Sequence, residues 1–401
     1  MGIGFLLGSC GVFQKEKEGL DLPLLTFLSL TLNNSAYQWN LPTGFPTPKV
    51  PVENPMSQAK ADLGRFLFYD KRLSGNDSMS CSSCHLQELA FSDGKTFPSG
   101  ITGDIHPRNS QQLVNVAYAP RLTWANPLQR SLEAQSRVPL FGESPIELGL
   151  TNDSYLSKLQ NDSRYPALFR TAFPNDANPV SEQNLRFALA SFQRTLISGN
   201  SRADQAIYQK KSSALNASEL RGLSFFNGET AECFHCHGGF NFTDTVLHNQ
   251  TVFEEVFYHN NGTRTKAFLD AQPIAKQGLK EITGQDSDQG KFKAPSLRNV
   301  GVTFPYMHDG SIMCDDATNP NKPSGVAQGA TKESCARNAL IKIIEQYSRG
   351  GNGHPNVDVT LIRPFSITDQ EKQDLVNFLM TLTDEEFLKN SNFSNPFRNE
   401  R

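Results

Sequence analysis

Cysteine and histidine residues form two copies of one short pattern. The first copy is Cys81-Ser-Ser-Cys84-His85, and the second is Cys233-Phe-His-Cys236-His237. The pattern C-x-x-C-H is the attachment signal for a c-type haem, in which two thiols add to the porphyrin vinyl groups and the adjacent imidazole lies under the iron. A zinc knuckle would need two further ligands near each pair, and a redox C-x-x-C would need a βαβ context. The sequence therefore predicts two covalent haem c groups with His85 and His237 as proximal iron ligands.

The segments around the two motifs also repeat. Residues 61–70 and 219–228 precede the motifs, and both favour a helix with its apolar residues on one side. An aromatic–Ser/Thr–Asp turn follows each motif, at Phe91-Ser-Asp93 and at Phe242-Thr-Asp244. The same order occurring twice indicates an internal duplication. Further helices are predicted over residues 182–197, 337–347 and 368–381, the last opened by a capping box between Thr368 and Glu371.

The predicted fold is mostly α, with two tandem cytochrome c-like domains, long loops and haems that face the interdomain interface. We expect a signal end and tether over 1–50, a first haem domain over 51–198, a second over 199–390, and a tail over 391–401. A length of 401 residues with 37% hydrophobic residues suits a globular protein. The net charge of −3 argues against a general nucleic-acid binder, and no apolar run is long enough to span a membrane.

The remaining cysteines bear on the cellular compartment. Covalent haem attachment in bacteria takes place outside the cytoplasm, where Cys314 and Cys335 would form a disulfide; two free thiols are the alternative. Cys10 ends Phe5-Leu-Leu-Gly-Ser-Cys10, which resembles the end of a lipoprotein signal, although no Lys or Arg precedes its short apolar region. We therefore expect a periplasmic or cell-envelope protein with a lipid anchor at Cys10, an accidental resemblance being the alternative.

Several segments resemble the bacterial dihaem cytochrome c peroxidase and MauG family, from about Pro51 to Leu382. They are Pro107-Arg-Asn-Ser110, in which Gln111 follows where the family has Pro, together with Pro139–Gly149, Ala294–Asn299 and Thr303–Gly310. The segment Leu122–Pro127, with Pro139–Gly149, looks most like the MbnH-type branch. Members of that branch oxidise a tryptophan of a partner protein.

The resemblance implies roles for residues near the first haem. Its iron would be held only by His85 and would have an open face for peroxide. Glu147 would be the acid/base that moves a proton between the peroxide oxygens, and Gln135 matches a second position in that pocket. The alternative to an open face is that His106 is a second ligand of this iron. Otherwise His106 packs in its loop or binds a haem propionate.

The resemblance also implies the surroundings of the second haem. Tyr347 falls where MauG-like enzymes have the sixth iron ligand, and Met307 and Met313 are its rivals. Trp124 would relay charge between the irons, with plain aromatic packing as the alternative. A Ca²⁺ ion would bind the Asn109 side chain and the carbonyl groups of Thr303 and Pro305. His308 would bind a propionate rather than iron, and His235 would lie at the surface.

The function implied by the resemblance is that of an exported dihaem oxidoreductase of the peroxidase type. Hydrogen peroxide would bring the two haems to a high-valent state, which then oxidises an aromatic side chain of a partner protein over a long distance. The main alternative is a cytochrome c peroxidase that scavenges peroxide with electrons from a small cytochrome or copper protein. A non-catalytic dihaem electron carrier is the second alternative.

Overall fold

The computed structural model describes Met1, residues 37–313 and residues 331–397. Short and medium helices joined by long loops make up this part of the chain, and β-structure within it is limited to isolated bridges. The mostly α prediction is therefore confirmed. No helix within these residues is long and apolar enough to cross a membrane. Cys10 and Cys314 lie outside the described residues.

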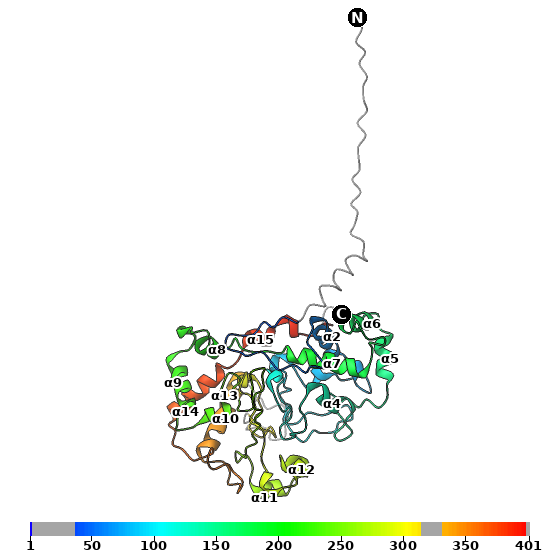
Figure 1. Ribbon diagram of the computed structural model, residues 1–401. Coiled ribbons are helices and arrows are strands. Elements are labelled where there is room, and N and C mark those ends of the chain that lie inside the picture. Colours follow the sequence, from blue (N-terminus) through cyan, green and yellow to red (C-terminus); the bar gives the residue numbers. More distant parts are fainter. Residues whose placement is uncertain (2–36, 314–330, 398–401) are drawn as a thin grey trace.

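The first haem motif begins in a short 3-10 helix (Cys81–Ser83), the second forms α10, and α-helices surround both (Figure 1). Their bounds are α2 (Gln58–Tyr69), α3 (Leu132–Gln135), α4 (Arg137–Phe141), α5 (Ser154–Gln160), α6 (Tyr165–Ala172), α7 (Glu182–Arg194), α8 (Arg202–Ile207), α9 (Ala217–Phe226), α10 (Cys233–His237), α11 (Lys266–Asp270), α12 (Lys280–Thr283), α13 (Lys332–Ser348), α14 (Asp369–Met380) and α15 (Glu385–Lys389).

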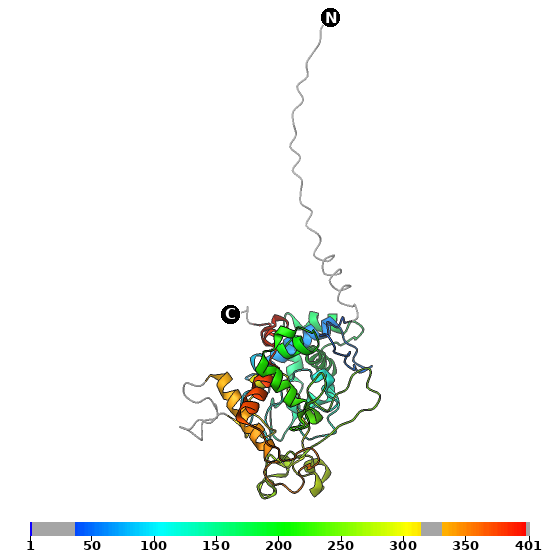
Figure 2. The ribbon, with the colours of Figure 1, turned by 90° about the vertical axis from the view of Figure 1, so that its left-hand side faces the viewer.

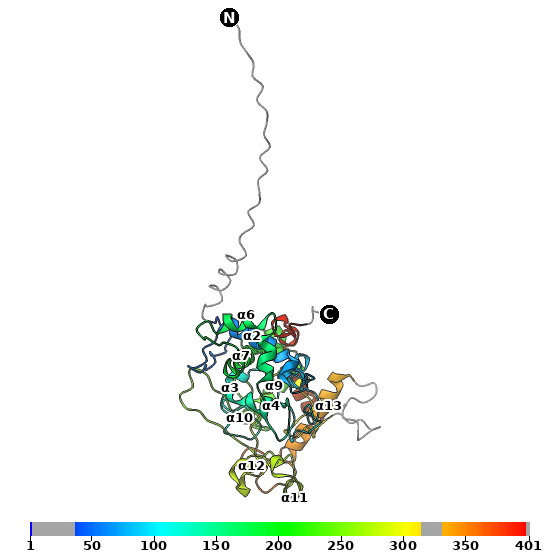
Figure 3. The same cartoon turned by 90° about the vertical axis from the view of Figure 1, so that its right-hand side faces the viewer.

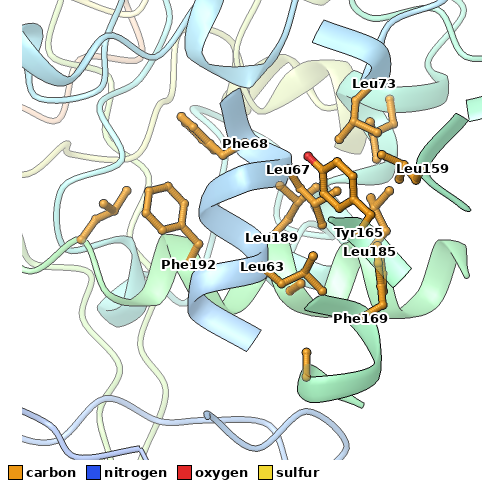
Figure 4. Close-up of a cluster of buried hydrophobic side chains, with 14 of the residues drawn as sticks. Leu63, Leu67, Phe68, Leu73, Leu159, Tyr165, Phe169, Leu185, Leu189 and Phe192 are labelled. Carbon is orange, nitrogen blue, oxygen red and sulfur yellow. The ribbon is translucent and has the colours of Figure 1, made fainter. Parts of the chain in front are cut away.

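The helices α2 and α7 pack tightly together at the centre of the first half, the part of the chain that carries the first haem motif. Leu63, Leu67 and Phe68 of α2 meet Leu189 and Phe192 of α7 in a cluster of buried apolar side chains, as Figure 4 shows. The helices approach closely because Gly64 has no side chain: an added Cβ would lie 1.9 Å from the Ala188 carbonyl oxygen. Each Å² of apolar surface that these side chains remove from water stabilises the fold by about 25 cal/mol.

The second half repeats the same arrangement with α9 and α14. A Cβ on Gly222 would lie 2.0 Å from the Asp374 carbonyl oxygen, as Gly64 does against α7. Between the two helices of each pair, the chain carries an asparagine in the left-handed region, Asn115 (φ 54°) and Asn299 (φ 58°). Their backbone N–H groups donate to the carbonyl oxygens of Leu196 and Leu382, both at 2.9 Å. This shared geometry supports the internal duplication inferred from the motif order.

Gly222→Ala should destabilise the second half because its methyl group would overlap a backbone carbonyl that cannot rotate away. Overpacking of this kind typically costs about 1–3 kcal/mol. Thermal unfolding of the holoprotein should show a lower melting temperature. Ser224→Ala, on the exposed side of the same helix, is the matched control and should change stability by less than about 0.5 kcal/mol. An unchanged melting temperature for Gly222→Ala would contradict the close packing of α9 and α14.

The predicted helices are confirmed with small differences at their ends. The helix predicted over residues 182–197 is α7, which ends at Arg194. The helix predicted over residues 337–347 lies within the longer α13. The capping box of α14 is present, since the Thr368 side chain accepts from the Glu371 N–H and the Glu371 carboxylate accepts from Thr368. The domain bounds at residues 50, 198 and 390 stay predictions.

The last described residues of the chain, from α15 onward, pack their apolar side chains on the first half. Phe387 and Leu388 of α15 belong to the buried cluster built on α2 and α7. Arg65 of α2 donates to the Ser394 carbonyl oxygen at 2.7 Å, and the Tyr69 hydroxyl donates to that of Phe393 at 2.7 Å. The first half is therefore completed by residues that follow the second half in the sequence.

A long excursion of the chain over residues 263–292, which carries α11 and α12, lies at the lower end of the molecule in Figures 1, 2 and 3. Arg108 of the first half donates to the Ala275 carbonyl oxygen at 2.9 Å and forms an ion pair with Glu281. The Lys276 ammonium lies 4.7 Å from the centre of the Phe97 ring. The excursion thus ties the second half to the loop of residues 95–108.

Cys335, near the start of α13, is completely buried and disulfide-bonded. Its predicted partner Cys314 lies outside the described residues, so the pairing of these two cysteines stays a prediction. The cysteines of the two haem motifs are free thiols.

Candidate functional site

The two motif histidines are oriented by the same kind of hydrogen bond. His85 Nδ1 lies 2.7 Å from the Phe91 carbonyl oxygen, and His237 Nδ1 lies 3.3 Å from that of Phe242. Both phenylalanines adopt positive φ, 62° and 49°, which turns their carbonyl groups toward the imidazoles. A carbonyl oxygen can only accept, so Nδ1 carries the proton and Nε2 keeps its lone pair for a metal. A histidine that binds a metal usually donates its other ring N–H to a carbonyl or carboxylate oxygen in this way, which fixes the direction of its lone pair.

The second motif opens into a cavity of about 290 Å³. Cys233, Cys236 and His237 line it together with Trp124 and Tyr347. Two free thiols and an oriented imidazole therefore face one cavity, which is the donor set that a haem c needs. The residues present fit the group that the motif predicts.

Tyr347, near the end of α13, brings its hydroxyl group into this cavity. The oxygen accepts a hydrogen bond from Asn261 Nδ2 at 3.0 Å. Burial raises the pKa of the Tyr347 hydroxyl to about 12, although the Asn261 amide acts in the opposite direction. The phenol is thus neutral by itself, and a nearby cation such as ferric iron would be needed to favour the phenolate.

The two methionine rivals of Tyr347 are placed differently. Met307 also lines the cavity, and its sulfur lies 3.7 Å from the same Asn261 Nδ2. Met313 is not among the lining residues; its carbonyl oxygen accepts from the Lys342 ammonium at 3.2 Å. Of the three candidate ligands for the second iron, Tyr347 and Met307 therefore line the cavity. Ligation by Tyr347 stays a prediction.

Trp124 lies in the wall of the cavity and is only 9% exposed. Its indole N–H donates to the Asn109 carbonyl oxygen at 2.8 Å, and its own carbonyl oxygen accepts from the Lys293 N–H at 2.8 Å. Asn109 belongs to the loop that follows the first motif. The indole is therefore held between the second cavity and the first half, as a relay between two haems would require.

His308 also lines the cavity and stacks on Phe292, with ring centres 3.6 Å apart and 13° between the planes. Burial lowers the pKa of His308 to about 4, so the imidazole is neutral at pH 7. His235, in contrast, is exposed and lies 3.6 Å from the Glu232 carboxylate. The expected surface position of His235 is confirmed.

Glu147 lies near the first motif in the loop between α4 and α5. Burial raises the pKa of its carboxyl group to about 7. Burial also raises the pKa of the Cys84 thiol to about 11, with smaller contributions from Asp93 and from Glu147, which places the carboxylate close to this motif. The loop can reach this position because Gly100 has no side chain: a Cβ there would lie 1.7 Å from the Ile146 carbonyl oxygen.

His106 is brought to the same place. Its Nε2 lies 3.8 Å from Glu147 Oε1, and the Arg108 N–H donates to its Nδ1 at 3.2 Å. Burial lowers the pKa of His106, so the neutral imidazole faces the carboxyl group. Gln135 ends α3 and is half-buried, and its side chain makes no hydrogen bond with Glu147 within the described residues. The structure thus brings together Glu147 and His106.

The three expected calcium ligands border the second cavity. Asn109, Thr303 and Pro305 are all lining residues. The Asn109 amide nitrogen donates to the Lys95 carbonyl oxygen at 2.6 Å, which leaves the amide oxygen as the ligand atom. This donor set suits Ca²⁺, and the ion stays a prediction.

Two features of the second cavity escaped the sequence analysis. His259 lies between two carboxylates, with Nε2 2.7 Å from Asp244 and Nδ1 3.3 Å from Asp358. Burial lowers its pKa, but the hydrogen bonds with both carboxylates outweigh burial and raise the pKa of His259 overall. Lys293, which also lines the cavity, is the second feature. Asp244 belongs to the repeated turn, but His259 and Asp358 stand at no regular spacing from it, so the sequence pattern does not reveal this cluster.

Comparison with known proteins gives a consistent result. Residues 58–212 match the family model described as Di-haem cytochrome c peroxidase. The chain is 31% identical to the methylamine utilization protein MauG of Methylorubrum extorquens, over 85% of this chain and 82% of that protein. It is 32% identical to the cytochrome-c peroxidase IdrP1 of Pseudomonas sp. strain SCT, over 92% and 94% of the two chains.

A solved structure is also similar over nearly its whole length. A MauG-like protein associated with microbial copper homeostasis shares 40% sequence identity with this chain and superposes with a TM-score of 0.81. The match covers 90% of this chain and 100% of that one. The diheme peroxidase BthA from Burkholderia thailandensis, at 21% identity and a TM-score of 0.62, shares the fold.

Proposed function

We propose, from the premise that this chain belongs to the dihaem cytochrome c peroxidase and MauG family, that it oxidises a tryptophan side chain of a partner protein at the expense of hydrogen peroxide. Membership of the family makes the chain a peroxide-dependent oxidoreductase with two haem c groups. The proposal concerns the electron donor. The observation that carries it is the Tyr347 hydroxyl in the wall of the second cavity.

A phenolate is a hard, anionic ligand, which stabilises oxidised iron and lowers its reduction potential, whereas a thioether raises the potential. Tyr347 would therefore favour storage of oxidising equivalents over rapid reduction by a small redox protein. The similarity to a MauG-like protein, at 40% identity, supports the same choice.

The two haems supply the redox chemistry: peroxide takes up two electrons and two protons and becomes two water molecules, while the partner's side chain loses two electrons. Glu147 would accept the proton of the oxygen that binds first and return it to the oxygen that leaves, which a carboxyl group with a pKa of about 7 can do near neutrality. His106 lies 3.8 Å from that carboxylate and would exchange protons with it, both side chains being about one third exposed, at 32% and 33%. Gln135 would contribute to the same pocket.

Trp124 would carry electrons between the halves. Its indole N–H is held by the Asn109 carbonyl oxygen and its backbone carbonyl group by the Lys293 N–H, so the orientation of the residue is fixed. Fixed geometry suits a relay, because electron transfer then needs little rearrangement. Ca²⁺ at Asn109, Thr303 and Pro305 would stiffen the same region, and export to the cell envelope with a lipid anchor at Cys10 would place the enzyme near exported partners.

The test uses the holoenzyme, hydrogen peroxide and a small exported protein that contains tryptophan. Mass spectrometry should locate a peroxide-dependent oxidation on one tryptophan of that protein. Trp124→Phe should still consume peroxide in its first reaction, but partner oxidation should be strongly slowed, because a phenyl ring is much harder to oxidise than indole. The chain has only two tryptophans. Trp39→Phe is the matched control, since Trp39 packs on Tyr37 and does not line the cavity.

Scavenging of peroxide is the second candidate function, favoured by similarity to proteins named cytochrome-c peroxidase, such as IdrP1. Rapid oxidation of reduced cytochrome c by peroxide, with an unmodified partner, would favour this function and contradict the proposal.

A further inference from the structure

Lys293 is a cation without a counter-charge of its own in the second cavity. Among the other cationic residues that line the cavity, Arg363 pairs with Glu232, and Arg121 pairs with Glu254 through Nη1. The Lys293 ammonium makes no hydrogen bond or ion pair within the described residues. An unpaired ammonium in such a place is costly unless an anion joins it.

The surroundings of Lys293 leave room for an incoming anion. Burial lowers the pKa of the Lys293 ammonium to about 8, and Asp244 counteracts this only in part. The Asp244 carboxylate is already engaged by His259 at 2.7 Å. A second donor is vacant as well: Arg121 Nε is buried and has no hydrogen-bond partner. A half-buried ammonium without a partner and a buried guanidinium N–H without an acceptor therefore border one cavity.

A haem brings two carboxylates into this cavity. We propose that the Lys293 ammonium and Arg121 Nε bind the propionate carboxylates of the haem attached to Cys233 and Cys236. The inference rests on the haem c that the family implies, and not on which partner is oxidised.

This assignment would orient the haem. Cys233 and Cys236 of α10 would hold its thioether edge. Lys293 would hold its carboxylate edge, and the Lys293 backbone N–H binds the Trp124 carbonyl group at 2.8 Å. One residue would thus contact the haem through its side chain and the Trp124 segment through its backbone. Lys293 is a positioning residue in this sense.

The experiment measures the reduction potential of the second haem by optical redox titration, without peroxide or partner. Lys293→Met should shift the one-electron equilibrium toward the ferric form by at least tenfold, which corresponds to about 59 mV, because a positive charge near the carboxylates is lost. Lys293→Arg keeps the charge and should stay near the wild-type potential. Lys291→Met is the matched control, since Lys291 pairs with Asp288 at 3.0 Å and does not line the cavity.

A Lys293→Met potential equal to that of Lys291→Met would overturn the proposal, as would equal shifts in the Met and Arg variants. Where Lys293→Met fails to retain its second haem, the haem content of Lys293→Arg decides. Two haems per chain would support a charge-based role, and one haem would refute it. The result is independent of partner oxidation, so failure of either proposal is recognised separately.

Discussion

Glu147→Gln should slow the reaction of the ferric protein with hydrogen peroxide by about 10²–10⁴-fold, the usual contribution of a positioned acid/base, while both haems stay attached. Gln keeps the shape of the side chain and its hydrogen bonding, but it cannot accept a proton. The raised pKa of about 7 makes Glu147 able both to accept and to release a proton near neutral pH. The geometry supports the same role, since this carboxyl group lies beside His106.

The pH dependence follows from the sign of the shift. Proton acceptance needs the carboxylate, so the wild-type rate should rise as the pH passes through about 7 and level off above it. The Gln variant should lack this rise. Stopped-flow absorbance after mixing with peroxide measures both rates. Glu143→Gln is the matched control, because Glu143 is exposed on the same loop. A wild-type rate in Glu147→Gln would move the proton-shuttle role to His106.

Tyr347→Met should raise the reduction potential of the second haem by more than about 59 mV, a tenfold change in the one-electron equilibrium. The reason is the exchange of a hard anionic oxygen for a neutral thioether that favours ferrous iron. The variant should also reduce peroxide with a small cytochrome as donor more readily than the wild type does. Redox titration monitored by visible spectra measures the potential.

Tyr258→Phe is the matched control for that change. Its buried hydroxyl has no hydrogen-bond partner, and the residue does not line the cavity. An unaltered potential and spectrum in Tyr347→Met would show that Tyr347 is not the ligand. Met307, whose sulfur approaches the same Asn261 amide, would then be the residue to replace.

The motifs and the helices next to them could be predicted from sequence because both signals are local. C-x-x-C-H fixes its chemistry within five residues, and an apolar stripe identifies α2 or α14 within three turns. Contacts over long distances could not be found in this way. Nothing in residues 385–397 indicates that Arg65, 329 positions from Ser394, is its partner. A helix with apolar residues along one side is expected to pack against another element, but its sequence does not identify that element.

The site was predictable to a similar extent. Cys233, Cys236 and His237 are explicit in the pattern, and the resemblance supplied Tyr347 and Trp124, which the structure places in one cavity. Lys293 and His259 were missed because a single lysine or histidine has no spacing to distinguish it. Their significance comes from the absence or presence of partners in space, which only the fold reveals.

The packing of the chain end on the first half bears on whether each haem repeat can fold by itself. Phe387 and Leu388 fill part of the cluster around α2, and Phe91, which holds His85 through its carbonyl group, has its ring 6.0 Å from that of Phe387. A fragment cut after the first repeat would expose this apolar surface and lose the wall behind its own haem-binding turn. The duplication is thus one of sequence and geometry, whereas the core of the first repeat is completed by residues that follow the second. Gene fragments that each encode one repeat are therefore poor starting points for single-haem proteins.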